Sequence, residues 1–385
     1  MKMRATVNSV LAGIFLHKHP YGSTAADELI ALTHDQVERF LRDGYLYLPG
    51  FFRENDESLA RLLVAGDALV QKKHANNTNY RTFSVMETGI IFGGDDTCNT
   101  NSILQDDGDC EQQHNHHQAF RDIALRSKLV QACAELMQLD PATTQSMRIL
   151  RDVFLAKPVE SEQVCDWHVD DQSFWPESFL SGLPPKQDGA FRSSGINAWL
   201  AMDDMPAIYA GSMAVSPGSH TAVWRLDAYR AVGQDDRTKE PNMTKVDLKQ
   251  LLSSSGQPPT TNSTCNMIIS DPELREQIEA TKVLLDIGKG DVVLADRLLF
   301  HRTLALTREG REHFKKLSKN ALNRYSIRYV PGSARLPVGF NTEASLLMDP
   351  ENSGMTLDDV VDKGLLWYPK VWPDQDSDID KALVE

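Results

Sequence analysis

The chain has 385 residues, 41% of them hydrophobic and 24% charged, which is typical of a globular protein with a sizeable core. Its formal net charge of −14 disfavours a nucleic-acid partner, although one local basic pocket could still bind an anionic small molecule. No apolar run approaches the roughly 20 residues that cross a bilayer, so we expect a small-molecule partner and no membrane span.

The cysteines indicate a reducing compartment. They are five in number, widely spaced and without a CxxC pair, so neither a disulfide framework nor a thiolate zinc site is expected: Cys98, Cys110, Cys133, Cys165 and Cys265. This pattern favours the cytoplasm or another reducing intracellular compartment. At the N-terminus, Lys2 and Arg4 precede a short apolar stretch at residues 7–16, which leaves open a weak targeting segment or a loosely packed terminus.

The first third of the chain predicts helices that serve as packing elements. Thr33 and Gln36 form a capping box for a helix that ends at Gly44, and a short strand follows at residues 45–48. Helical periodicity then predicts helices at residues 57–72 and 118–138.

After Pro141 the pattern changes to short β-rich segments bounded by turns. We expect strands at residues 147–155, 196–202, 212–216, 283–287, 291–295 and 323–330. Helices followed by short strands predict a mainly β sandwich or barrel with α decoration. A polar stretch at residues 227–280 interrupts the strands, and we interpret it as a lid-like insertion over the barrel mouth.

These elements predict a single domain of 385 residues with four parts. They are an N-terminal extension (1–30), a helical packing region (31–140), a β core (141–340) and a C-terminal segment (341–385). Trp367, Tyr368 and Trp372 suggest that the last part docks on the barrel.

A His-x-Asp pair suggests a metal site. On a strand, residues i and i+2 point to the same side, so His168 and Asp170 could bind one ion, and the strand after Asp291 leads to His301 as a third ligand. Two imidazoles and one carboxylate leave three open positions on an octahedral ion, the arrangement used by Fe(II) oxygenases for a 2-oxo acid and O₂. Because Asp170 occupies the carboxylate position, no vacancy remains for a halide ligand, and halogenation is not expected.

An isolated His-x-Asp is a weak signal, and the downstream segment strengthens it. Arg324 and Ser326 alternate on one predicted strand, where they offer a guanidinium fork and a hydroxyl to a carboxylate. Thr303 adds a hydroxyl beside His301. The alternative for Arg324 is a surface ion pair.

With these residues the sequence resembles the phytanoyl-CoA dioxygenase family over about residues 35–340. The similar stretches are DGYLYLPGF (43–51), WHVD with QSFW (167–175), WLAMDD with PGSH (199–220), and GD through His301 to Arg324. The resemblance implies a double-stranded β-helix (a jelly-roll, cupin-like core), an Fe(II) ion, 2-oxoglutarate as cosubstrate, and succinate and CO₂ as products. It also implies that Trp199 lines the cosubstrate pocket with Lys157 nearby.

The sequence departs from the family in its spacing. The segment at residues 302–323 is longer than usual, so Arg308 or Arg311 could compete with Arg324 for the cosubstrate. We prefer Arg324 because it begins a strand.

Other signals have weaker functional readings. Trp167 and Trp175 flank the expected ligands and could contact substrate or simply pack around the strand. His114, His116 and His117 follow a polar loop at residues 106–113 and are expected to be solvated. Two further residues, Asp171 and His220, are expected to be structural.

We therefore expect a dioxygenase that hydroxylates an unactivated C–H bond of a small organic molecule. Oxidative cyclisation or desaturation of a specialised metabolite by the same chemistry is an alternative, and so is a non-catalytic jelly-roll binding protein. The sequence does not reveal the substrate or the oligomeric state. Basic residues in the remaining pocket would indicate a di-acid or amino acid, and a long apolar trench would indicate an acyl chain.

Overall fold

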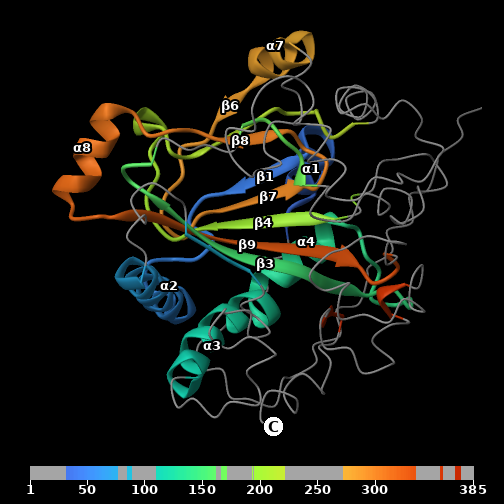
Figure 1. Ribbon diagram of the computed structural model, residues 1–385. Helices are drawn as coiled ribbons and strands as arrows, with labels where there is room; N and C mark the ends of the chain where they lie inside the picture. The colour runs from blue at the N-terminus through green and yellow to red at the C-terminus, as the bar shows by residue number, and fades with distance from the viewer. Residues whose placement is uncertain are drawn as a thin grey trace, which may run out of the picture.

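The computed structural model describes residues 32–76, 85–88, 110–161, 166–170, 193, 195–221, 272–334, 356–358 and 369–373. Two antiparallel sheets form its core (Figure 1). The large sheet has the order β1 (Tyr45–Leu48), β7 (Val292–Asp296), β4 (Ile196–Ala201), β9 (Ala321–Pro331), β3 (Met147–Pro158) and β10 (Lys370–Trp372), and β2 (Val85–Thr88) also pairs with β3. The small sheet has the order β6 (Val283–Leu284), β5 (Met213–Val215) and β8 (His301–Thr303).

The chain passes repeatedly from one sheet to the other. It runs from β4 to β5 and β6, returns to β7, crosses to β8 and returns to β9. Apolar side chains of both sheets share one buried cluster, which includes Trp199, Met213, Val215 and Val293. This winding confirms the expected mainly β double-stranded β-helix.

Helices cover the outer face of the large sheet. They are α1 (His34–Asp43), α2 (Glu57–Asn76), α3 (Cys110–Arg126) and α4 (Lys128–Leu136). Their apolar side chains join a second cluster with the outward-facing residues of the sheet, such as Leu200, Leu294 and Ile327. In Figure 1, α2 and α3 lie below this sheet, and β6, β8 and α7 (Pro272–Thr281) lie above it.

Strand β9 has two different faces although all of its residues are buried. Tyr325, Ile327 and Tyr329 join the helical cluster. Because side chains alternate along a strand, Arg324, Ser326 and Arg328 must face the interior between the sheets. A buried strand therefore places polar and charged groups inside the barrel.

Several local predictions are confirmed. Thr33 and Gln36 form the capping box of α1, and Gly44 ends that helix at φ 79°. The strand at residues 45–48 is β1, and it pairs with β7. Trp372 lies in β10, which pairs with β3, whereas Trp367 and Tyr368 lie outside the described residues.

Other local predictions are wrong. The helix expected at residues 118–138 is two helices, because Ser127 has extended backbone angles and its side chain caps α4 by accepting the N–H of Leu129. Helix α3 begins at Cys110, so His114, His116 and His117 are helical and follow no loop at residues 110–113. The strand expected at residues 283–287 is reduced to the two exposed residues of β6.

Two helices were not expected. Helix α8 (Arg308–Lys316) occupies the long spacer between β8 and β9. Helix α7 forms the end of the predicted insertion, and residues 227–271 of that insertion lie outside the described residues. No helix in the described ranges is long and apolar enough to cross a membrane. Residues 1–31, which hold the suggested targeting segment, are not among them.

Candidate metal centre

His168 and His301 are neighbours through their backbones. They form an isolated antiparallel bridge in which each N–H donates to the carbonyl of the other, at 3.1 and 3.0 Å. His301 begins β8, and β5 pairs with the other side of that strand. The expected strand through residues 168–170 is therefore only a one-residue bridge, because the chain turns at Asp170 after a single pairing.

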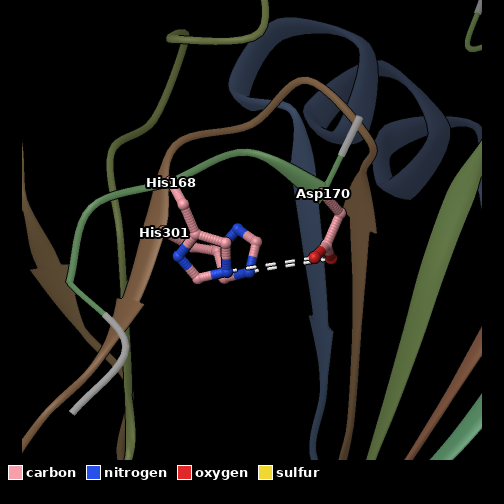
Figure 2. A group of neighbouring side chains, drawn as sticks. All are labelled: His168, Asp170 and His301. Carbon is pink, nitrogen blue, oxygen red and sulfur yellow. Dashed lines mark ion pairs between the residues drawn. The ribbon is translucent and has the colours of Figure 1, made fainter. Parts of the chain in front are cut away.

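The bridge brings two imidazoles and one carboxylate together. Figure 2 shows the two rings overlapping, with their nitrogens turned towards Asp170. Nε2 of His168 lies 3.9 Å from Asp170 Oδ1, and Nε2 of His301 lies 3.7 Å from Asp170 Oδ2. Since imidazole and carboxylate bind first-row metals at about 2 Å, these separations suit two ligands on one ion. No other group of three potential ligands of this kind occurs in the described ranges.

The tautomers of the two histidines also suit a metal. Nδ1 of His168 lies 2.7 Å from the carbonyl oxygen of Asp166, and Nδ1 of His301 lies 3.0 Å from that of Leu299. A carbonyl can only accept, so each Nδ1 carries the proton and donates it, and each Nε2 presents a lone pair. Both rings are thereby oriented with Nε2, and not Nδ1, facing the Asp170 carboxylate.

Burial and neighbouring charges set the ionisation of the group. Burial lowers the pKa of His168 to about 4, helped by His301, so the imidazole is neutral at pH 7. Burial alone would raise the pKa of Asp170, but His301, Arg328, His168 and a hydrogen bond from Asn197 together hold it below its usual range. The centre therefore presents a neutral His168 imidazole and an ionised Asp170 carboxylate, a combination that suits a divalent ion.

Two residues that the sequence analysis missed hold Asp170 in place. The Asn197 amide donates to Asp170 Oδ2, and its Oδ1 accepts a 2.6 Å hydrogen bond from Ser326 Oγ. Nη2 of Arg328 lies 3.5 Å from Asp170 Oδ1. The only available signal was a polar residue in each of two buried strands, Asn197 in β4 and Arg328 in β9, and it did not identify their partner. Ser326, expected beside the cosubstrate, here supports Asn197.

The other predicted cosubstrate residues cluster at one end of the interior. Arg324 is buried, with its guanidinium carbon 5.9 Å from the Trp199 ring centroid. Lys157 is buried and donates to the Leu304 carbonyl at 2.9 Å, one residue beyond the half-buried Thr303. Burial lowers the pKa of Arg324 to about 10, and burial with the nearby Arg324 charge lowers that of Lys157 to about 7. Cationic groups thus meet where an anion could offset their cost of burial.

The rival arginines are engaged elsewhere. Arg308 is 81% exposed and pairs with Glu312 on α8. Arg311 donates to the carbonyl of Leu306 at 2.9 Å.

Trp167 faces an ion-pair cluster and not the two histidine rings. Its indole N–H donates to Glu279 of α7 at 3.0 Å, and Arg302 stacks over its ring at 4.9 Å. Arg302 also pairs with Glu279 at 2.5 Å, and Arg275 of α7 pairs with Asp166 at 2.7 Å. Helix α7 is therefore fastened to both segments that carry the histidines.

Of the three remaining candidates, only His220 is described. Trp175 and Asp171 lie outside the described residues. His220 is fully buried against Gly44, and its Nε2 lies 3.1 Å from the Leu41 carbonyl, which agrees with a structural role.

Known proteins resemble the chain at two levels. The sequence model of the phytanoyl-CoA dioxygenase (PhyH) family matches residues 40–312, well over half of the chain. No curated protein matches the sequence.

Solved structures resemble the chain distantly. One is the non-haem alpha ketoglutarate dependent carbocyclase SnoK from nogalamycin biosynthesis, at 16% identity and a TM-score of 0.49, covering 90% of this chain and 100% of that one. Another is EctD from S. alaskensis with 2-oxoglutarate and 5-hydroxyectoine, at 16% identity and 0.48, covering 86% of each. HygX from Streptomyces hygroscopicus, with nickel and 2-oxoglutarate bound, has 17% identity and 0.46, covering 86% and 99%. On the family match, the chain belongs to the phytanoyl-CoA dioxygenase family and is a non-haem Fe(II)- and 2-oxoglutarate-dependent dioxygenase.

Proposed function

We propose that His168, Asp170 and His301 bind the ferrous ion, and that the enzyme oxidises a C–H bond of a small organic molecule. The overall reaction converts the substrate, 2-oxoglutarate and O₂ into a hydroxylated product, succinate and CO₂. When bound, the ion with its cosubstrate supplies the oxidant that removes hydrogen from the substrate carbon. The observation that carries the proposal is the pair of Nε2 lone pairs facing one ionised carboxylate.

The chain's own residues orient the ligands of the ion. The Asp166 and Leu299 carbonyls fix the two imidazole rings, and Asn197 fixes the Asp170 carboxylate. Because Leu299 and Asn197 are buried, Asp166 is half-buried and all three are already in place, little reorganisation is needed when the ion binds.

Arg324 is our candidate for binding the distal carboxylate of 2-oxoglutarate. Its Nε and Nη1 are buried and have no hydrogen-bond partner within the described structure. A guanidinium fork matches a carboxylate, and Lys157 adds a second cation when protonated. Trp199 would contact the cosubstrate beside Arg324, and Thr303 would offer it a hydroxyl.

The test is decarboxylation of 2-oxoglutarate by purified protein with Fe(II) and O₂, measured as succinate formed. We expect slow turnover without substrate in the natural protein and none in His168→Ala. Arg308→Gln, on the exposed face of α8, is the matched control and should retain turnover. Full turnover by His168→Ala would refute the proposal.

A further inference from the structure

We infer that Arg328 binds an acidic group of the substrate, so that the molecule oxidised is a small organic acid held by its carboxylate. The inference rests on the proposed function and deepens it by assigning a substrate class. Arg328 lies four residues beyond Arg324 on the same inward face of β9, opposite Asn197 in the register with β4.

Arg328 is buried with most of its hydrogen-bonding capacity unused. The residue is 9% exposed, and within the described ranges its one contact to a carboxylate is the 3.5 Å approach of Nη2 to Asp170. Its Nε and Nη1 have no hydrogen-bond partner among the residues that the structure describes. Since an arginine stays protonated, burying these N–H groups unpaired is costly, and an anion beside them would offset that cost.

Asp170 cannot be that anion by itself. Its Oδ2 already accepts from Asn197, and both of its oxygens face histidine Nε2 atoms. A carboxylate that binds a metal has little capacity left for the remaining donors of Arg328. Those donors are therefore available to a ligand that arrives beside the metal.

The charges of the interior also favour an anionic substrate. Arg324, Arg328 and a ferrous ion carry four positive charges, whereas Asp170 carries one negative charge. Dianionic 2-oxoglutarate neutralises two of the three positive charges that remain, which leaves one positive charge beside the reacting centre. Lys157 increases that excess whenever it is protonated. A monoanionic substrate would bring the buried site close to neutrality, and a neutral substrate would leave the excess in place.

The two arginines are far enough apart for two different ligands. At about 3.3–3.4 Å per residue, four residues along a strand separate their Cα atoms by about 13 Å. One carboxylate of 2-oxoglutarate is assigned to Arg324 and the other chelates the ion, so the cosubstrate does not need Arg328. The competing source of the same chemistry is the metal-bound carboxylate of 2-oxoglutarate, and the experiment separates the two.

The experiment is an anaerobic titration of the Fe(II) protein, followed by its visible absorption. 2-Oxoglutarate is added first, and acetate, with acetamide as its neutral counterpart, is then titrated into the loaded protein. Natural protein, Arg328→Gln, Arg328→Lys and Arg324→Gln are compared, with Arg308→Gln as the exposed control.

We expect acetate, but not acetamide, to perturb the absorption band of the natural protein and of Arg308→Gln. Arg328→Gln should weaken acetate binding by about 10- to 100-fold, as for a hydrogen bond to a charged group, with Arg328→Lys between them.

The outcomes separate this inference from the proposed function. A much larger loss of acetate affinity than of 2-oxoglutarate affinity in Arg328→Gln supports the inference, since Arg328 also contacts Asp170 and some loss of both is expected. An equal loss of 2-oxoglutarate affinity in Arg328→Gln and Arg324→Gln, without a second anion site, overturns it, because Arg328 then serves the cosubstrate. Acetate binding that is the same in Arg328→Gln and natural protein also overturns it. Absence of any 2-oxoglutarate band in the natural protein refutes the proposed function itself.

Discussion

His168 and His301 are joined by two backbone hydrogen bonds, and this single bridge brings together the ligands of the proposed metal centre. It fixes the distance between two ring ligands that lie far apart in the sequence. Their ring centroids are 4.2 Å apart, and Asp170 reaches the same point from two residues beyond His168. Contacts made by Asn197, Arg324, Lys157 and Gly290 give separate tests of this centre and of the barrel that supports it.

Removing the amide of Asn197 should weaken metal binding. Asn197→Ala leaves Asp170 without its amide donor, and loss of such a partner typically reduces metal affinity by about 10- to 100-fold. The measurement is anaerobic Fe(II) titration. Ser326→Ala is the comparison, since it removes only the hydroxyl that orients Asn197 and should reduce the metal affinity less. A larger loss in Ser326→Ala than in Asn197→Ala would contradict this order.

Arg324→Ala should raise the KM for 2-oxoglutarate. Loss of a charge-assisted hydrogen bond typically costs about 10- to 100-fold in affinity. Arg311→Ala is the comparison, because its guanidinium donates to the Leu306 carbonyl and should leave the KM within about twofold, as expected for a side chain outside the site. Initial rates measured at varied 2-oxoglutarate concentration give the KM of each variant. A larger increase in KM for Arg311→Ala than for Arg324→Ala would assign the binding of the cosubstrate to Arg311.

The affinity for 2-oxoglutarate should fall as the pH rises above about 7, where Lys157 loses its proton. Burial and Arg324 lower the pKa of the free amine, whereas a carboxylate bound beside it raises the pKa again. Below pH 7 the amine is already protonated and affinity is flat. Above it, binding must take up a proton, so affinity falls by up to about tenfold per pH unit until the pKa of the complex is passed.

The control for this pH dependence is Lys157→Met, which keeps an unbranched side chain, one atom shorter, but cannot titrate. Equilibrium titration with 2-oxoglutarate at several pH values should give a flatter profile for this variant. If the variant keeps the full slope of the natural protein, another group is responsible.

Gly290→Ala should destabilise the fold by about 1–3 kcal/mol, as strained backbone positions do. Gly290 lies just before β7 and has φ 86°, and a Cβ added there would collide with the backbone carbonyl oxygen of Phe52. Gly218→Ala is the matched control, because Gly218 has φ 80° but no atom within 4 Å of the new Cβ. Chemical denaturation of both variants separates the effect of the collision from that of the positive φ. Equal losses in the free energy of unfolding would show that the collision contributes nothing.

Local patterns in the sequence predicted the parts of the structure that depend on local chemistry. The capping box at Thr33 and the stop at Gly44 follow from side-chain-to-backbone bonds within a few residues. The His-x-Asp spacing and a late histidine after a short strand also identified the three residues that the structure brings together. A resemblance to a known family supplied the remaining expectations about Lys157 and Trp199.

Except for the break before α4, the missed features depend on partners that are distant in sequence. Asn197 contacts Asp170 only because β4 lies beside the metal loop, and nothing near Asn197 in the sequence encodes that contact. The position of Trp167 beside His168 in sequence is compatible with a substrate contact or with packing around the strand, and it does not encode the observed contacts with Glu279 and Arg302. The break before α4 was missed because apolar periodicity runs through Ser127, whose hydroxyl caps the next helix.

The most direct measurement is anomalous X-ray diffraction at the iron absorption edge from crystals grown anaerobically with Fe(II). The account predicts one strong peak among His168 Nε2, His301 Nε2 and the Asp170 carboxylate, and its loss in His301→Ala. A peak elsewhere in the molecule, or one that persists unchanged in His301→Ala, would contradict the assignment of these three residues.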